Sequence, residues 1–317
     1  MSILLQSVKA ANRVIAPFGV RLARAGAPSA SASSAPPMTY PAGFSRAQLL
    51  RSLISLKMDR PAPAELRAYA EADCDRFIYT LGMVPEHGGS VLEIGANPYF
   101  TTILLKQFRS FDITITNFFA GLKSEAFQDI SYTTVFNKQI EERLNYWNVN
   151  AESDKLPYDT DSFDLVLFCE VLEHMTNDPV AALTEIKRIL RPGGQLILTT
   201  PNVARTENVA RLIAGENLYD PYSGYGPYGR HNREYTVAEL ERLMIFCGFE
   251  REILFTGNVS STLRDGSSLV EDVIKATRTT DGELGQYIFS RWQNAGPIKR
   301  GKPTWLYRSY ASEELAD

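Results

Sequence analysis

Residues 91–100 read VLEIGANPYF, a short apolar run that ends at a glycine. The first four residues predict a buried strand, although the charged Glu93 interrupts the apolar side chains. Gly95 stands where that strand ends, and a residue without a Cβ lets the backbone come close to a ligand. A dinucleotide-binding turn would carry two further glycines, but Asn97 and Tyr99 occupy that part of the loop. The stretch by itself fits both a nucleotide-binding turn and an ordinary strand end.

Beyond this stretch, apolar runs of strand length alternate with amphipathic runs of helix length. Such alternation predicts βαβ units and a mostly parallel sheet. We expect an α/β fold with a doubly wound, seven-stranded sheet, N-terminal helices and an antiparallel C-terminal edge. No element is assigned to the polar segment that precedes residue 150. The expected helices are 100–109, 179–190 and 237–247, and the expected strands are 91–94, 111–116, 161–168, 195–200, 249–255 and 285–292.

Two of the expected helices carry start signals. Asp178 can cap the helix that begins at Pro179, and a proline suits a first helical turn. The glycine pair at 193–194 predicts where this helix ends. Thr236 stands in the capping position of the helix at 237–247.

The composition is that of a soluble globular protein. The 317 residues are 44% hydrophobic and 22% charged, which supplies enough apolar side chains for a core. The three cysteines lie far apart, so we expect neither a disulfide framework nor a zinc site, and a reducing compartment such as the cytoplasm is the default. Residues 1–58 carry seven basic and no acidic side chains, whereas the remainder has a net charge of −11. The main body would therefore repel nucleic acid.

The N-terminal residues predict a segment that is separate from the main domain. Residues 1–24 alternate apolar and basic side chains, and no uncharged run is long enough to cross a bilayer. They fit an amphipathic helix at the inner face of a membrane, a helix packed on the protein itself, or a targeting segment. Residues 25–43 predict a flexible linker. Residues 44–87 predict a helical cap, and residues 88–317 predict a domain with a lid at 215–236.

Three motifs follow one another in this domain: VLEIGANPYF from residue 91, SFDLVLFCEVLEH from residue 162 and LRPGGQLILTTPN from residue 190. In this order the series resembles the class I S-adenosylmethionine-dependent methyltransferases, in particular the branch with EVLEH and LkPGG motifs, over about residues 88–255. The resemblance implies a Rossmann-like methyltransferase fold and S-adenosylmethionine as the cofactor. A nucleotide-binding oxidoreductase fits less well, because the glycines are missing and RPGG precedes the fifth strand.

The resemblance also implies cofactor-binding positions, and several depart from the family pattern. Glu93 would orient the amino-acid part of the cofactor, or else it caps a local turn. Asn97 is expected to take the left-handed conformation in place of a glycine. Asn117 ends the second strand, where the family has an acidic residue on the ribose hydroxyls, and Asn150 with Ala151 matches the pair that reads the adenine. The complete set is Glu93, Gly95, Asn97, Asn117, Asn150, Ala151 and Cys169.

The catalytic candidates come from two segments. Glu170 and His174 are expected to lie on one face of a helix after the fourth strand, and the alternative is that the glutamates there only stabilise its first turn. Cys169 is either a small buried residue or a nucleophile. His231 is the candidate general base, because a histidine that titrates near neutrality removes a hydroxyl proton well. The alternative for His231 is a hydrogen-bonded lid residue without a catalytic role.

The segment 215–236 is expected to form a lid over the acceptor. It is rich in tyrosine and glycine, and its end, HNREYT, fits a pattern of the family. Tyrosines stack on sugars and bond to hydroxyl groups. The arginines can bind a phosphate or a carboxylate, or they can pair with Glu234. The expected acceptor-binding residues are Tyr225, Tyr228, Arg230, Arg233 and Tyr235.

Together these features predict O-methylation of a sugar, glycan or glycolipid, as in polysaccharide biosynthesis. A small-molecule or quinone-like acceptor is the alternative. A third possibility is a binding protein that kept the fold and lost the cofactor, which the asparagines at 97, 117 and 150 motivate. Because no acidic cluster stands at ligand spacing, no metal site is expected. Peripheral membrane contact through residues 1–24 stays open, as does the oligomeric state.

Overall fold

The computed structural model describes residues 35–86, 88–121, 123–260, 270, 272 and 284–316. The predicted membrane-surface segment, residues 1–24, and the first part of the predicted linker lie outside the described residues. Within the described ranges, no helix has the length and hydropathy that a membrane span requires.

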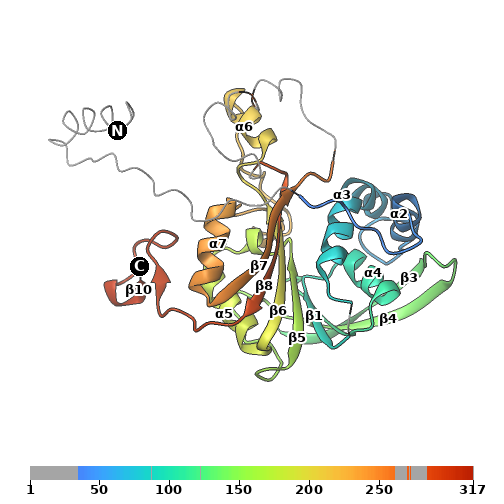
Figure 1. The fold of residues 1–317 in the computed structure, drawn as a ribbon, viewed down its shortest axis with the longest axis horizontal. Helices are drawn as coiled ribbons and strands as arrows, with labels where there is room; N and C mark the ends of the chain where they lie inside the picture. Colours follow the sequence, from blue (N-terminus) through green and yellow to red (C-terminus); the bar gives the residue numbers. More distant parts are fainter. Residues whose placement is uncertain are drawn as a thin grey trace. The chain divides into compact units, whose positions relative to one another are not determined.

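The centre of the molecule is a mixed sheet in the order β3-β4-β2-β1-β5-β6-β8-β7 (Figure 1). β1 lies between β2 and β5 and runs parallel to both, and β2–β4 and β5–β6 are parallel as well. The edge pairs β3–β4, β6–β8 and β7–β8 are antiparallel. The strands are β1 Ser90–Ile94, β2 Asp112–Asn117, β3 Ser124–Thr133, β4 Gln139–Asn148, β5 Phe163–Cys169, β6 Leu190–Pro201, β7 Phe249–Gly257 and β8 Tyr287–Asn294.

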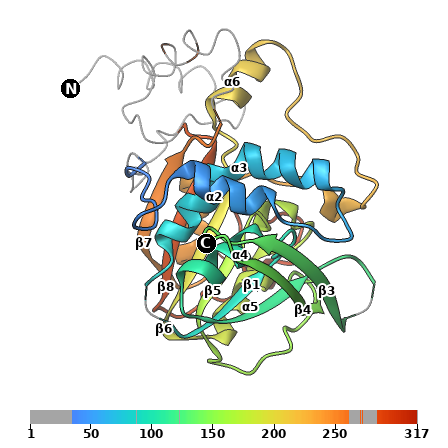
Figure 2. The same cartoon turned by 90° about the vertical axis from the view of Figure 1, so that its right-hand side faces the viewer.

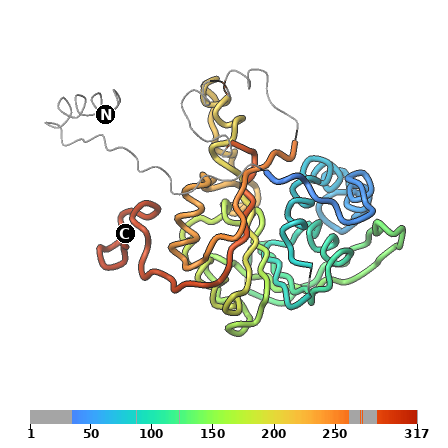
Figure 3. Tube along the Cα trace, in the orientation of Figure 1, coloured from blue at the N-terminus to red at the C-terminus, as the bar shows by residue number. Residues whose placement is uncertain are grey.

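Helices cover both faces of this sheet, as the doubly wound fold requires (Figures 1 and 2). One core cluster joins the helices α2, α3 and α4 to the sheet, and a second joins α5 and α7 to the other face. The tube in Figure 3 shows the chain passing between these layers. The helices are α2 Arg46–Ile54, α3 Pro63–Met83, α4 Phe100–Phe108, α5 Pro179–Ile189, α6 Thr206–Ile213 and α7 Val237–Phe246.

The sheet has eight strands where the sequence predicts seven. Six of the seven predicted strands were placed in the sequence, and the two observed strands without a predicted place form the β3–β4 hairpin, in the segment to which no element was assigned. The prediction missed it because most of its side chains are exposed or half-buried, so the strands do not show the apolar alternation of a half-buried strand. β4 adds parallel to β2 over only two residue pairs, and the rest of the hairpin extends beyond the sheet.

The helix start signals are confirmed, and one stop signal is wrong. The Asp178 side chain accepts from the amide of Ala181 at the start of α5, and Thr236 forms a capping box with Glu239 at the start of α7. However, α5 ends at Ile189 and not at the glycine pair 193–194. The LRPGG segment already belongs to β6, which is therefore longer than predicted.

Candidate active site

The candidate site lies at the carboxyl ends of β1, β2, β5 and β6, where the loops after these strands meet the lid. β1 is the central strand at which the connections turn to opposite sides, and ligands of open α/β sheets bind at such a point. Gly95 stands at the end of β1 with a φ of +74°. A Cβ at this position would lie 2.6 Å from Cγ2 of Val171, so the position requires a glycine for space as well as for conformation.

The loop after Gly95 is built differently from the prediction. Tyr99 takes the left-handed conformation, with a φ of +69°, and Asn97 does not. Tyr99 is fully buried and stands immediately before α4, so its ring anchors the loop in the core. Tertiary packing of a large aromatic side chain outweighs the local preference of asparagine for this conformation.

Asn117 braces this loop from the end of β2. Its Oδ1 accepts from the amide of Asn97 at 2.8 Å, and its Nδ2 donates to the hydroxyl of Tyr99 at 3.1 Å. Both ends of the amide are thus engaged within the protein, and the side chain is buried. The ribose contact expected of Asn117 would have to compete with these two bonds.

Glu93 and Cys169 lie at the floor of the site. Glu93 is buried, and its Oε2 accepts from the hydroxyl of Thr102 at 2.5 Å. Burial raises the pKa of Glu93 to about 8, against the weaker opposite effect of the Thr102 hydrogen bond. Burial likewise raises the pKa of Cys169 to about 12, so its thiol is protonated and unsuited to act as a nucleophile.

Arg76 of α3 reaches the same floor, and sequence reasoning missed it. Its guanidinium is buried, donates to the hydroxyl of Tyr69 at 2.7 Å and lies 3.9 Å from Oε1 of Glu170. Desolvation by itself lowers the pKa of Arg76. The neighbouring Tyr69 and Glu170 raise this pKa by more, so it lies well above the ordinary value. The available signal in the sequence was a basic residue among the apolar positions of a predicted helix, because a cation buried there needs a partner. Arg76, Glu93, Gly95, Asn97, Cys169 and Glu170 line one small cavity of about 60 Å³.

Asn150, beyond the end of β4, bonds to the lid. Its Nδ2 donates to the hydroxyl of Tyr228 at 2.9 Å, while its Oδ1 accepts from the amide of Glu152 at 2.9 Å. Tyr228 also packs edge-on against Phe118, with ring centroids 5.2 Å apart. The neighbouring Ala151 is buried. The structure therefore brings together a residue expected at the adenine and a residue expected at the acceptor.

The segment after β5 is not the predicted α-helix. Only a 3-10 turn, η2 Leu172–His174, forms there, and Glu170 lies before it with a φ of +55°. Glu170 and His174 consequently do not share a helix face. Glu170 instead accepts from the hydroxyl of Thr199 at 2.8 Å, and its pKa is raised chiefly by burial.

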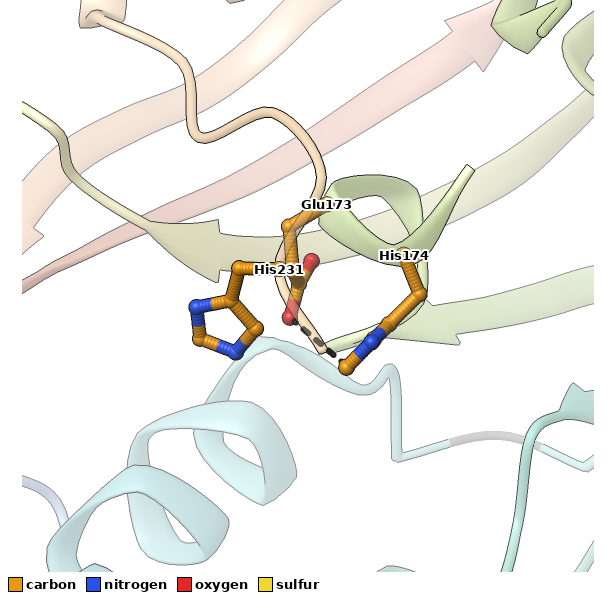
Figure 4. A group of neighbouring side chains, drawn as sticks. All are labelled: Glu173, His174 and His231. Atoms are coloured by element: carbon orange, nitrogen blue, oxygen red, sulfur yellow. Dashed lines mark ion pairs between the residues drawn. The ribbon is translucent and has the colours of Figure 1, made fainter. Parts of the chain in front are cut away.

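Glu173 and His174 of this turn form a compact cluster with His231 of the lid (Figure 4). One ligand atom from each residue lies within 4.8 Å of the others. Glu173 is fully buried, which raises its pKa to about 8, and the charge of Glu170 raises it too. Burial lowers the pKa of His174, and the charge of His231 acts in the same direction. The cluster therefore brings together groups whose pKa values are shifted, as is typical of functional sites.

A carboxylate orients His231. Its Nδ1 donates to Oε1 of Glu234 at 2.9 Å, and Arg205 holds the same carboxylate from the other side. Burial by itself lowers the pKa of His231, but Glu234 and then Glu173 raise it, and the net shift is upward. The pKa of Glu234 is depressed to about 2, because the bonds from His231 and Arg205 outweigh its burial. This arrangement of a carboxylate behind an imidazole is typical of catalytic and metal-binding histidines.

The backbone of the lid is fixed on the turn η2. The amide of Asn232 donates to the carbonyl of Glu173 at 2.8 Å, and its side chain donates to the carbonyl of His174 at 2.9 Å. Asn232 was not among the predicted site residues, since no property of its sequence position points to these bonds. These bonds of Asn232 hold the lid against η2, although the two segments are far apart in the chain.

The acceptor residues predicted on the lid have different environments. Tyr235 is only 1% exposed and belongs to the core, so it is not available to an acceptor and this part of the prediction is wrong. Tyr225 is 90% exposed. Arg233 donates to Oε1 of Glu239 at 2.6 Å, and Arg230 lies over the ring of Tyr222 with its Cζ 4.8 Å from the centroid.

Two larger cavities meet at His231. One, of about 270 Å³, is lined by side chains that include Asp73, Arg205 and Tyr287. The other, of about 740 Å³, lies between α6 and the lid. Its apolar lining residues are Val203, Leu212, Leu218 and Tyr219, and its polar ones include Glu216, Asn217, Asn232 and Arg233. A volume of this size is ordinary for a small-molecule site.

Comparison with known proteins adds a family to this geometry. Residues 104–198 match the model of a methyltransferase domain. A probable S-adenosylmethionine-dependent methyltransferase of Mycolicibacterium smegmatis is 30% identical over 122 residues, which are 37% of this chain and 42% of that protein. A ubiquinone biosynthesis O-methyltransferase of Parvibaculum lavamentivorans is 32% identical over 114 residues, 35% of this chain and 43% of that one. The chain thus matches less than half the length of these curated relatives.

A SAM-dependent methyltransferase from Archaeoglobus fulgidus superposes with a TM-score of 0.44 and 14% sequence identity, and the match covers 72% of this chain and 94% of that one.

Proposed function

We propose that the chain is a class I S-adenosylmethionine-dependent methyltransferase, as the methyltransferase-domain match over residues 104–198 supports, and that it methylates a hydroxyl oxygen of a small molecule. The observation that carries this proposal is that the Gly95 turn and the oriented imidazole of His231 lie beside the same segment after β5, Gly95 beside Val171 and His231 beside Glu173. The first is suited to a cofactor, and the second is suited to take a proton from a hydroxyl group.

The residues at the floor of the site fit S-adenosylmethionine. Gly95 takes a left-handed turn in which a Cβ would clash with Val171, and it lines the small cavity at the end of β1. The buried guanidinium of Arg76 is complementary to the cofactor's carboxylate, and the carboxyl of Glu93 is complementary to its ammonium group. The cavity of about 60 Å³ is smaller than the roughly 300 Å³ or more of typical ligand pockets. We therefore expect Arg76 and Tyr69 to move when the cofactor binds.

His231 is the residue we assign to proton removal. The cofactor, when bound, supplies an electrophilic methyl group. Because Nδ1 of His231 donates to Glu234, the lone pair on its Nε2 is left to accept the proton of an acceptor hydroxyl. Glu234 then stabilises the imidazolium that forms, and Arg205 keeps Glu234 in place.

The cavity between α6 and the lid is the proposed acceptor site. Its lining combines apolar side chains such as Leu212 and Tyr219 with polar ones such as Asn217, which suits a partly apolar hydroxyl compound. The name of the Parvibaculum relative supports a small-molecule or quinone-like acceptor. The glycan alternative draws its support from the exposed tyrosines of the lid, Tyr219, Tyr222 and Tyr225, which can stack on sugars.

Titration calorimetry with the full chain tests the cofactor step first. We expect S-adenosylmethionine and S-adenosylhomocysteine to bind with a Kd in the micromolar range. If neither binds at millimolar concentration to a folded sample, the chain is a binding protein that lost the cofactor. Formation of S-adenosylhomocysteine is then followed with a panel of phenols and catechols and a panel of sugars. Turnover of the sugars alone would favour the glycan acceptor.

A further inference from the structure

We propose that Glu173, His174 and His231 form a binding site for a divalent first-row transition-metal ion. The donor atoms of these three side chains lie within 4.8 Å of one another at the junction of η2 and the lid (Figure 4). The two histidines come from distant segments of the chain, and their rings meet edge to face with centroids 5.0 Å apart. The binding site stands independently of the proposed function, and only its role in catalysis rests on that function.

One oxygen of Glu173 lacks a partner. Its side chain is fully buried, and Oε2 accepts from the hydroxyl of Thr200 at 2.9 Å, but Oε1 has no hydrogen-bond donor. Leaving a buried acceptor unsatisfied costs about 1 to 3 kcal/mol, and more for a charged group. Oε1 points toward the two imidazoles, 3.9 Å from Nε2 of His174. A bound cation would supply the partner that this oxygen lacks.

Both histidines are held as metal ligands are. Nδ1 of His174 donates to the carbonyl of Arg230 at 2.9 Å, and Nδ1 of His231 donates to the carboxylate of Glu234 at 2.9 Å. In each ring the second nitrogen, Nε2, keeps its lone pair for a ligand. Metal-binding histidines almost always donate their other N–H to a carbonyl or a carboxylate, because this fixes the ring and makes the ligating nitrogen more basic.

The distances between the three donor atoms are slightly longer than a metal site requires, so a small movement of the side chains would be enough to bind an ion. Ligand bonds of about 2.1 Å in a tetrahedral site place donor atoms about 3.4 Å apart, so the observed spacing must shrink by about 1.4 Å at most. Side-chain rotation supplies this change. The backbone is already fixed, because Asn232 bonds to the carbonyls of both Glu173 and His174.

The donor set selects the class of metal. Two imidazoles and one carboxylate suit zinc, cobalt, manganese or iron(II), whereas calcium and magnesium prefer ligands that are all oxygen. Three protein ligands also leave a coordination position open, which is typical of catalytic and not of structural sites.

An ion held by these residues would supply acid strength that the proposed function requires. A hydroxyl oxygen bound to this ion would lose its proton to water at a lower pH, because the ion lowers the pKa of the hydroxyl. The resulting oxyanion attacks the methyl carbon, and the carbon–sulfur bond breaks with its electron pair on sulfur. In the metal-loaded protein Nε2 of His231 is therefore a ligand, and it acts as a base only in the metal-free protein.

Cobalt titration of the full chain, freed of metal with a chelator, tests the site. We expect one Co²⁺ per chain, a visible absorption spectrum typical of nitrogen and oxygen ligands, and displacement by Zn²⁺. His231→Gln and Glu173→Gln should weaken Co²⁺ binding by at least about tenfold, on the scale of lost ligand interactions. Glu125→Gln is the matched control, because Glu125 is an exposed carboxylate on β3.

Circular dichroism of each variant checks its fold. His231 is partly exposed on a loop, so His231→Gln keeps the test valid even if the buried Glu173→Gln fails to fold. Absence of stoichiometric Co²⁺ binding, or equal binding by the wild type and His231→Gln, overturns the proposal. S-adenosylhomocysteine binding is measured on the same samples: if it persists without a metal site, only this inference fails, and if Co²⁺ binds without it, only the proposed function fails.

Discussion

Replacement of Glu93 by glutamine should change how the stability of the protein depends on pH. The pKa of Glu93 is raised from an ordinary value of 4.5 to about 8 by burial. Between these two values the unfolded chain has lost the Glu93 proton while the folded protein retains it. The free energy of unfolding must therefore fall as the pH rises through this range, and it is highest below the unfolded pKa.

The magnitude follows from the two pKa values. Each pH unit between them contributes about 1.4 kcal/mol, so the loss that Glu93 alone can cause is at most about 5 kcal/mol at pH 8. Glutamine has nearly the same shape, and its amide oxygen can still accept from the hydroxyl of Thr102. Glu93→Gln should therefore match the wild type near pH 5 and exceed it in stability near pH 8.

Urea unfolding at several pH values between 5 and 8 measures this difference. Some pH dependence should remain in Glu93→Gln, because Glu173 is also buried with its pKa raised to about 8. Glu125→Gln, which changes an exposed carboxylate, should follow the wild type. If the Glu93→Gln and wild-type curves are parallel over the whole range, Glu93 is not protonated in the folded protein and the reasoning fails.

Three further substitutions test the site and its frame. Gly95→Ala should cost about 2 to 4 kcal/mol of stability in urea and abolish S-adenosylhomocysteine binding, because its Cβ meets Val171 at 2.6 Å in a left-handed turn; recovery of most of the loss in the double variant with Val171→Ala would confirm the steric part. Thr236→Ala should lower the free energy of unfolding by about 0.5 to 2 kcal/mol through loss of the α7 cap, and an unchanged urea midpoint would contradict this. Asn117→Ala should cost about 1 to 3 kcal/mol, because it leaves the half-buried amide of Asn97 without its acceptor, and it should weaken cofactor binding measured by calorimetry; an unchanged affinity would show that this loop does not hold the cofactor.

The sequence was sufficient for the framework of the fold. The apolar strands β1 and β5 and the amphipathic helix α5 are recognisable because one property, burial, repeats along each of them. The caps of Asp178 and Thr236 are equally local, since the capping bonds span only a few residues. Features that depend on local spacing could therefore be predicted.

The candidate site depends on contacts between distant segments and was predicted only in part. Glu173 and His231 meet because of backbone bonds from Asn232, and no spacing in the chain indicates this. Arg76 belongs to a helix that precedes the first motif, so the motif series does not include it. Tyr235 follows the same polar segment as the exposed lid tyrosines, yet it is buried because the chain enters the core just before α7.

The hydrogen bond between Asn150 and Tyr228 bears on the order in which substrates bind. The resemblance implies that the adenine amine donates to Oδ1 of Asn150, while Nδ2 of the same amide donates to the hydroxyl of Tyr228 and so anchors the lid. A bound cofactor would therefore fix the amide that anchors the lid, and the acceptor site would be complete only after the cofactor is in place. Steady-state kinetics should accordingly show a compulsory order, with cofactor first and S-adenosylhomocysteine last to leave, and Tyr228→Phe should make the order random.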